Sequence, residues 1–538
     1  MGKPAILREN MNNKLTRAFC AIFSAALLAG CSSQGSSGVS VADFGTSGGV
    51  NYSGITDVTS GTESAQTTCG AESAEVSSAP ESRTDSIGST ASSVSASPET
   101  SVTTRTDAAP EPADTTSAAT SGTPAPSVTG TSTAKPSAAQ TTTEKTTARQ
   151  TSASTSVPEV PDYDYSSTSY TALNYQEVKG VWISYIELAE LMQGQSKSAF
   201  RSNIAAVFDN CVSLGINTVY VHVRSHSDAY YKSELFPWSK YITGTLGSEP
   251  GYDPLAVMLE EAHNRSLSFQ AWINPLRACS TSQINSYGSY PVYTFATASG
   301  MAGKYAVDVN GTYYLNPAYE EVTELIAAGA SEILSNYDVD GLHIDDYFYP
   351  TTDTSFDSSA YSGSGYTSLS DFRFANCDRM VQELYSAVKK TNPTAIFSVS
   401  VQGRIDNNYN QLYADVRKWC TNSGYLDVMI PQIYYGFENT AAPYQSTLDE
   451  WEELAKKGGI PLVVGLSVSK VGCEDAWAGG GKNEWINNND IISRQLAAAK
   501  KCSTYGGFAL YSYRSVFSPD SSVSAAVSKE ISALKELI

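Results

Sequence analysis

The chain has 538 residues, of which 41% are hydrophobic, and a formal net charge of −20. A surface this acidic repels a phosphate backbone, so the charge argues against a nucleic-acid-binding function. All seven tryptophans lie between Trp182 and Trp485, and residues 32–174 are dominated by Ser, Thr, Ala, Gly and Pro. Such a segment buries too little apolar surface to offset the entropy lost on ordering. We therefore expect a disordered tether over 32–174 and one folded domain over 175–538.

The first residues have the pattern of a secretory signal. Lys14 and Arg17 precede an apolar run that closes in LAGC at residues 28–31. The run is too short for a permanent membrane span and matches the apolar core of a signal peptide. The closing pattern is typical of a bacterial lipoprotein, which predicts a signal over 1–31, lipidation at Cys31 and a lipid-anchored protein on the extracytoplasmic face of the cell membrane. An ordinary signal peptide with a coincidental cysteine is the alternative.

The nine cysteines do not form a recognisable framework. The six in the predicted domain are widely spaced and include no CxxC pair, so neither a zinc ribbon nor a redox motif is present. Several fall on predicted helix faces, where a buried free thiol is the ordinary expectation. We predict no disulfide.

From Val178 onward, strand-like and helix-like segments alternate. The helical pattern is clearest over 198–215, 254–266, 317–337 and 490–502. Strictly alternating strands and helices favour parallel pairing with right-handed crossovers, and eight such units close into an α/β fold of the (β/α)8 TIM-barrel type. An open doubly wound sheet would need a Gly-rich loop after the first strand, and none occurs there. The predicted strands cover residues 180–184, 216–224, 268–277, 340–349, 395–404, 426–435, 460–469 and 506–513.

Two connections are longer than a barrel requires. They follow the third and fourth strands, at 278–315 and 350–370, and are rich in Ser, Gly and Tyr. In a barrel these connections lie on the C-terminal face, where enzymes of this fold build their active sites. Functional residues are therefore expected at the last positions of each strand and in the loops that follow.

The fourth strand, DGLHIDDYFYP, has the most unusual end. Leu342 and Ile344 alternate with His343 and Asp345, so the apolar pair should face the helices and the polar pair the barrel lumen. Asp346 follows at the mouth. A buried ionised carboxylate is costly unless it is paired or used. A structural Asp satisfied by an arginine or a backbone amide is the alternative to a functional one.

The other strand ends carry amides, aromatic rings and guanidinium groups around this carboxylate pair. Aromatic faces stack on pyranose rings, and amides and guanidinium groups hydrogen-bond to hydroxyl and acetamido groups. Any one of these aromatic residues is more often a core residue, so the inference depends on their collection at one rim. The predicted substrate-binding residues are Arg224, Asp228, Trp272, Asn274, Arg277, His343, Tyr347, Gln402, Arg404, Gln432, Tyr434 and Tyr513.

Competing chemistries have weaker patterns. The chain has four histidines and no HxH or HExxH motif, so we predict neither a metal nor another cofactor. Convergence of His222, His343 and Asp345 on a metal stays an alternative. No GxSxG motif for a serine nucleophile occurs.

Several motifs together resemble the glycosyl hydrolase-like 10 family. They are VYVHVRSHSDAYYKS, AWINPLR, YYLNPAYEEV, DGLHIDDYFYP and PQIYY, and the resemblance extends from about Glu177 to Tyr513. Members are TIM-barrel proteins of bacterial envelopes, often lipoproteins, and one enterobacterial member cleaves peptidoglycan glycan strands stripped of their stem peptides. The resemblance implies a hydrolase of a β-linked amino-sugar polymer but identifies no catalytic pair. The site residues that it supports are Arg224, Asp228, Trp272, Asn274, Arg277, Asn316, His343, Asp345, Asp346, Tyr347, Gln432 and Tyr434.

Glycoside hydrolysis ordinarily uses two carboxyl groups on opposite sides of the bond. We predict that Asp345 or Asp346 performs acid/base work and that Glu438, just past the sixth strand, is its partner, with Asp228 and Glu187 as weaker candidates. The acetamido group of the substrate could replace the second carboxylate.

One of three arginines (Arg224, Arg277 or Arg404) is expected to pair with the lactyl carboxylate of N-acetylmuramic acid. Two other functions stay open: a non-catalytic lipoprotein that binds cell wall or polysaccharide, and a metal-assisted polysaccharide deacetylase. A polysaccharide and, through the lipid anchor, the membrane are the predicted partners.

Overall fold

The computed structural model describes residues 167–538. The predicted signal, its Cys31 and the tether up to residue 166 lie outside this range and stay predictions. Among the described cysteines five are free. Cys473 is disulfide-bonded, so the prediction of no disulfide is wrong for that residue. No helix within the described range is both long and apolar enough to cross a membrane.

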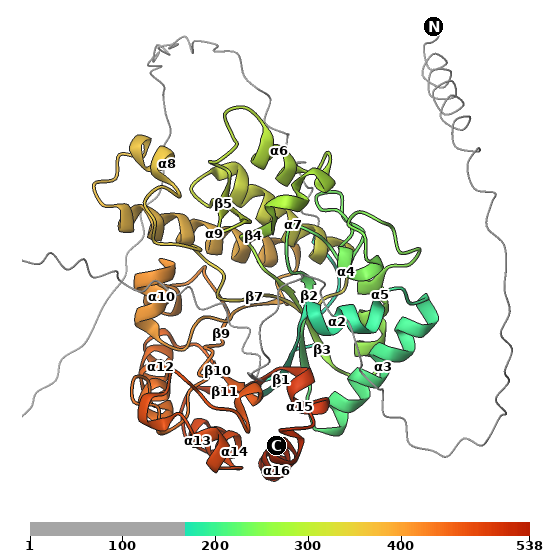
Figure 1. Cartoon of the computed structure of the whole chain (residues 1–538), viewed down its shortest axis with the longest axis vertical. Helices are drawn as coiled ribbons and strands as arrows, with labels where there is room; N and C mark the ends of the chain where they lie inside the picture. The colour runs from blue at the N-terminus through green and yellow to red at the C-terminus, as the bar shows by residue number, and fades with distance from the viewer. Residues whose placement is uncertain (1–166) are drawn as a thin grey trace, which may run out of the picture. The chain divides into compact units, whose positions relative to one another are not determined.

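Eight parallel strands close into a barrel, as predicted (Figure 1). Each predicted strand is present, and most are shorter than their sequence pattern because the ends belong to loops on the C-terminal face. Around the barrel the order is β1-β11-β10-β9-β8-β7-β3-β2. The barrel strands are β1 (Val178–Ile183), β2 (Thr218–Arg224), β3 (Ser268–Ile273), β7 (Gly341–Ile344), β8 (Ile396–Val399), β9 (Val428–Met429), β10 (Leu462–Ser467) and β11 (Tyr505–Tyr511).

Helices surround the barrel (Figure 1). Their starts follow ordinary capping chemistry: Asp253 accepts a hydrogen bond from Ala256 N and precedes Pro254, and Ser196 accepts one from Ala199 N. The α-helices are α2 (Tyr185–Met192), α3 (Lys197–Ser213), α4 (Lys240–Thr243), α5 (Pro254–His263), α6 (Pro291–Thr297), α7 (Glu320–Asn336), α8 (Ser358–Gly363), α9 (Leu369–Thr391), α10 (Ile405–Leu412), α11 (Val416–Thr421), α12 (Tyr444–Gly458), α13 (Glu484–Asn487), α14 (Ile491–Ala499), α15 (Tyr513–Phe517) and α16 (Ser524–Lys535).

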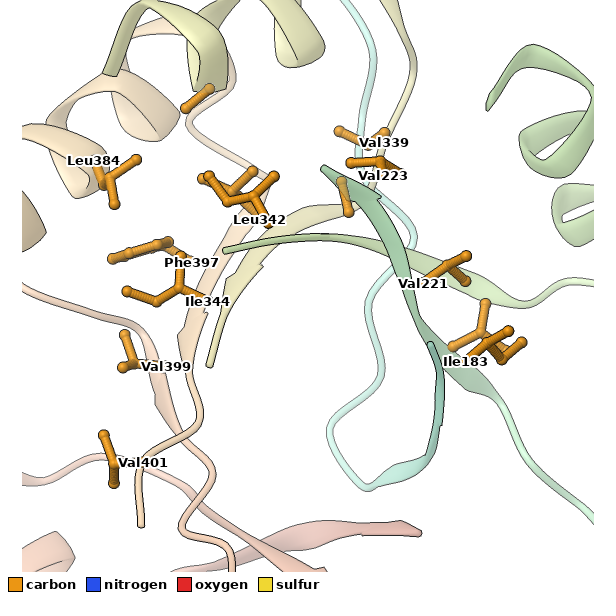
Figure 2. Close-up of a cluster of buried hydrophobic side chains, with 14 of the residues drawn as sticks. Ile183, Val221, Val223, Val339, Leu342, Ile344, Leu384, Phe397, Val399 and Val401 are labelled. Atoms are coloured by element: carbon orange, nitrogen blue, oxygen red, sulfur yellow. The ribbon is translucent and has the colours of Figure 1, made fainter. Parts of the chain in front are cut away.

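The core has two parts, because successive side chains of each barrel strand point to opposite faces. Leu342 and Ile344 of β7 lie level with Phe397 and Val399 of β8, and all four belong to the layer between strands and helices (Figure 2). A second cluster fills the lumen with Trp182, Tyr220, Trp272, Val428, Ile430 and their neighbours. The predicted inward and outward faces of the fourth barrel strand are therefore confirmed.

The long connection after β3 contains a small sheet that the sequence reasoning treated as loop. Its strands β4 (Arg277–Ser280), β5 (Ala306–Val309) and β6 (Thr312–Leu315) pair antiparallel in the order β4-β6-β5. The turn between β5 and β6 is Asn310-Gly311, with positive φ at both residues. An Asn-Gly pair between short β-prone runs is a strong hairpin signal, so this element was predictable.

The folded body begins before residue 175. Tyr170 OH and Leu173 N donate hydrogen bonds to Asp340 Oδ1, each over 2.6 Å, and Asn174 donates to the Asp340 carbonyl. The last residues of the predicted tether, from Thr168, therefore pack against the N-terminal end of the barrel.

Candidate active site

Asp345 lies at the C-terminal end of β7 and is 4% exposed. Its Oδ2 accepts a hydrogen bond from Trp272 Nε1 over 3.0 Å. Asn274 Nδ2 lies 3.3 and 3.4 Å from its two oxygens. Both donors come from β3 and the residues that follow it, because β3 pairs directly with β7. Asp345 is thus held at the barrel mouth by two neutral side chains.

Asp346 follows Asp345 and is partly exposed. Gln432 Nε2 donates to its Oδ1 over 3.3 Å, and a hydrogen bond from Gln402 also favours the ionised form. Gln402 and Gln432 come from β8 and β9 ends that are joined by a bridge. The two neighbouring carboxyl groups therefore have separate sets of partners, one on each side of β7.

Both carboxyl groups are harder to ionise than usual. Burial, followed by the charge of Asp346, raises the pKa of Asp345 to about 7, although Arg277 and Trp272 act in the opposite direction. Burial also raises the pKa of Asp346. Two neighbouring carboxyl groups of this kind titrate as a coupled pair. The pair retains a proton close to neutral pH, as acid catalysis requires.

His343 lies below the pair in the lumen and is fully buried. Trp182 Nε1 donates to its Nε2 over 3.0 Å, and its Nδ1 lies 2.8 Å from Ser398 Oγ. Burial lowers the pKa of His343 to about 3, so the ring is neutral. Its two nitrogens are used within the core, which makes His343 a support for the mouth rather than a substrate contact.

Arg277 and Tyr347 form the side of the site next to the pair. Arg277 Nη1 donates to Tyr347 OH over 3.2 Å, and the guanidinium carbon is 4.5 Å from the centre of the Tyr347 ring. Nε and Nη2 of Arg277 donate to the Ser225 carbonyl. Across the mouth, Tyr434 lies 5.7 Å from Tyr511 between ring centres.

Asp228 borders a cavity of about 280 Å³ beside Arg277 and Tyr347. Its carboxyl group is almost fully buried, and burial raises its pKa to about 6. Oδ1 of Asp228 accepts no hydrogen bond from the described residues. Sequence reasoning missed Lys240 and Tyr314, which also line the cavity, since neither stands at the end of a predicted strand.

Besides His343, two predicted substrate-binding residues do not reach the mouth. The register of β2 shifts between His222 and Arg224, so Arg224 leaves the inward face. Its guanidinium is fully buried, 4.6 Å from the Phe236 ring centre, and no described residue hydrogen-bonds to it. Tyr513 lies beyond β11 in α15, where its hydroxyl accepts a hydrogen bond from Asn210 of α3.

The remaining predicted residues are on exposed loops or have structural roles. Arg404 and Glu438 are exposed, and neither side chain has a hydrogen bond or ion pair with the rest of the described chain. Glu187 accepts hydrogen bonds from Ser512 Oγ and Arg514 N, which fastens the start of α2 to the end of β11. Asn316 is fully buried and binds the Lys304 carbonyl.

Within residues 167–538, no cluster of three or more His, Cys, Asp or Glu side chains is arranged to hold a metal ion. His222, His343 and Asp345 are therefore not gathered into such a cluster. The ring of His222 instead stacks on Trp272.

Comparisons with known proteins identify the family of the chain. Residues 177–478 match the family model described as glycosyl hydrolase-like 10. Glycosyl hydrolase YngK of Bacillus subtilis strain 168 is 30% identical over 321 residues, which are 55% of this chain and 61% of that protein. Glycosyl hydrolase DigH of Escherichia coli K12 is 30% identical over 332 residues, 56% of this chain and 75% of DigH.

Among solved structures, the glycoside hydrolase domain of PgaB (BpsB) from Bordetella bronchiseptica has a TM-score of 0.43 and 11% identity, over 62% of this chain and 94% of that domain. A GH20 exo-β-N-acetylglucosaminidase from Vibrio harveyi has a TM-score of 0.41 and 10% identity, over 67% of this chain and 54% of that one. The family match covers more than half of the chain and includes every barrel strand up to β10. The chain therefore belongs to the glycosyl hydrolase-like 10 family.

Proposed function

We propose that the chain is a glycoside hydrolase that cleaves an amino-sugar-containing polysaccharide, namely peptidoglycan glycan strands that lack stem peptides. The observation that carries the proposal is the carboxyl pair Asp345–Asp346 at the barrel mouth, where both pKa values are raised and the surrounding donors are neutral. Family membership supports the reaction class. The substrate is proposed from the resemblance to a family member that acts on such strands.

In the proposed reaction the pair supplies the acid. A proton held by the pair passes to the glycosidic oxygen as the bond to the anomeric carbon breaks, and the remaining negative charge stabilises the positive sugar ring. A water molecule then supplies the hydroxyl of the new reducing end, and its proton returns to the pair. Asp346 is the more exposed member and is placed to meet the substrate, whereas Asp345 lies beneath it. Tyr434 and Tyr511 offer aromatic surface on the opposite side of the mouth.

The second group in the reaction is either a carboxylate of the chain or the acetamido group of the substrate. Glu438 is exposed on the loop after β9, and Glu484 holds the backbone N–H of that residue. A Glu438→Gln variant separates the two routes. A loss of 100-fold or more identifies Glu438 as the partner carboxylate, and a rate within twofold of the wild type excludes Glu438 and leaves Asp228 or the acetamido group of the substrate for the step.

The test measures reducing ends released from peptide-free glycan strands. Asp345→Asn and Asp346→Asn should each lower the rate by about 100-fold or more, as expected for the loss of an acid/base group. Asp338→Asn is the matched control, because Asp338 is exposed at the opposite end of the barrel. Undiminished rates in both pair variants would remove β7 from the chemistry.

A binding protein without catalysis is the second candidate, because Glu438, the predicted partner carboxylate, is exposed on a loop and no interaction within the described chain fixes its side chain. That function predicts glycan binding with no product at any pH. We also propose that the protein acts outside the cytoplasm, anchored to the membrane by lipid at Cys31. Labelling with a fatty-acid analogue tests this, with Cys31→Ser as the variant that should lose the label.

A further inference from the structure

The cavity beside the carboxyl pair is small and has mixed walls. The segment between β2 and α5 contributes Asp228 and Lys240. The small β4-β6-β5 sheet contributes Arg277 and Tyr314. Its volume of about 280 Å³ is near the lower limit of small-molecule sites, roughly 300–1,000 Å³. A space of this size accommodates one sugar unit and not a longer segment of glycan.

Positive charge prevails in the cavity although the chain as a whole is acidic. Lys240 and Arg277 line it, and Asp228 is the one carboxylate among the described lining residues. Lys240 forms no ion pair with any described residue, and its Nζ lies 5.0 Å from the centre of the Tyr241 ring. His226 adds no charge, because burial and the two cations keep its pKa well below the ordinary value. The cavity thus has an unneutralised cation.

Asp228 supplies an acceptor in the same place. Hydrogen bonds from the Ser239 side chain and the His226 backbone favour the ionised form of its carboxyl group, whereas its Oδ1 is shielded from solvent and has no hydrogen-bond partner among the described residues. A buried acceptor without a donor is costly, so a bound group that carries a hydroxyl or amide N–H would be favoured there. The cavity therefore combines positive charge for an anion with an acceptor for a neighbouring polar hydrogen.

The cavity adjoins the carboxyl pair through Arg277 and Tyr347. Tyr347 follows Asp346 in the chain and lines the cavity, and its hydroxyl accepts a hydrogen bond from Arg277. The charge of Arg277 also lowers the pKa values of both Asp345 and Asp346, so the guanidinium is within electrostatic reach of the pair. A sugar held in the cavity would lie next to the glycosidic oxygen that the pair protonates.

We propose that this cavity is a subsite for a carboxylate-bearing amino-sugar unit, whose carboxylate binds Lys240 and Arg277 while a hydroxyl or amide N–H binds Asp228. The inference rests on the proposed function and makes its substrate class more specific. Of the three arginines predicted to read a lactyl carboxylate, Arg277 is the one that lines the cavity. The carboxylate could belong to a lactyl ether or to a uronic acid, and the experiment separates these two sources.

The experiment measures binding by calorimetry to the full-length chain carrying Asp346→Asn, which prevents turnover. The ligands are a peptide-free tetrasaccharide from peptidoglycan, the same tetrasaccharide with its carboxylates converted to methylamides, a tetramer of N-acetylglucosamine, and a hyaluronan tetrasaccharide. The acidic peptidoglycan fragment should bind at least tenfold more tightly than its neutral derivative. If hyaluronan binds as tightly as the acidic peptidoglycan fragment, the site recognises sugar carboxylates in general. If hyaluronan binds more weakly, the site recognises the lactyl group.

Adding Lys240→Met should weaken binding of the acidic fragment about tenfold and change binding of the neutral ligands less than twofold. Lys240→Arg should restore the preference. Lys482→Met is the control, since Lys482 is an exposed lysine that pairs with Glu474 in the connection after β10 and does not line the cavity. Equal binding of acidic and neutral fragments by the parent, or equal weakening of both by Lys240→Met, would overturn the subsite.

The two proposals can fail separately. If the wild type releases no reducing ends but keeps a preference that depends on Lys240, the hydrolase proposal fails and the subsite stands. If it cleaves acidic and neutral glycans at equal rates and binds them equally, the subsite fails and the hydrolase stands.

Discussion

Two buried aspartates mark the two ends of β7 and have opposite surroundings. Asp340, at the base, accepts hydrogen bonds from Leu173 N and Phe269 N over 2.6 and 2.7 Å, besides those from Tyr170 OH and His263. Asp345, at the mouth, accepts bonds of 3.0–3.4 Å from two neutral side chains and lies beside a second carboxyl group. Burial alone therefore does not mark a functional carboxylate. The supply of donors separates a structural aspartate from one whose proton is available for chemistry.

Removal of the Asp340 carboxylate, at the N-terminal end of β7, should have the largest effect on stability. Asp340→Asn places an amide against the two backbone donors, so the free energy of unfolding should fall by about 3–5 kcal/mol, as for a broken buried pair. The activity of the molecules that remain folded should not change, because the mouth is at the other end. Urea denaturation and a rate normalised to folded protein test both parts. A selective loss of activity with unchanged stability would reverse the comparison.

The pH dependence of stability and of activity tests whether Asp345 at the mouth has a raised pKa. Because the pKa of Asp345 is raised to about 7, the native state holds a proton that the unfolded state releases near pH 4. This contribution to stability is fully present below about pH 4 and is lost as the pH rises through about 7. Activity should fall above the same pH as the pair loses its proton. Asp345→Asn should flatten the slope of stability between pH 4 and 7, and an unaltered slope would show that Asp345 is ionised throughout.

Trp272→Phe should have a smaller effect, seen mainly as a shift of the pH–rate profile. It removes the indole donor to Asp345 Oδ2, and because that bond favours the ionised form, the pKa of Asp345 should rise further. The alkaline limb of the rate profile should then move to higher pH, with a rate loss of about tenfold or less at the optimum. A profile lowered at all pH values without displacement would mean that Trp272 acts through packing alone.

Tyr170→Phe should have the smallest effect. It deletes one of several donors to Asp340, and a lost hydrogen bond to a charged group costs about 1.5–3 kcal/mol, here toward the lower value because Tyr170 is only part-buried. Thermal denaturation should detect the change with no change in rate. A cost equal to that of Asp340→Asn would show that the segment from Thr168 detaches as a unit.

The fold was largely predictable and the site only in part. Period-two and helical patterns placed all eight barrel strands, because each buries one face against helices. The outward turn of Arg224 was not predictable, since the register shift in β2 depends on pairing with β3. Tyr513 was misplaced because β11 ends two residues earlier. The donors to Asp340 come partly from a segment whose composition resembles a tether, so their role emerges only from the packing.

The residues at the mouth differ in how far their positions follow from the sequence. Asp345 and Asp346 were identified because a strand end in a barrel has a known direction and an acidic pair there is unusual. Glu438 was chosen for its position after β9 alone, and position does not determine where a loop side chain points. Lys240 stands far from any strand end in sequence, and only the fold of the loop after β2 brings it beside Arg277.

The most direct measurement is mass spectrometry of the products formed by the purified chain from peptidoglycan, with and without prior removal of stem peptides by an amidase. The wild-type chain should release short glycan fragments with new reducing ends from the pretreated material, and the Asp346→Asn variant should release none. Intact strands after prolonged incubation across pH 5–8, despite measurable binding, would contradict the hydrolase proposal and leave a wall-binding protein as the better description.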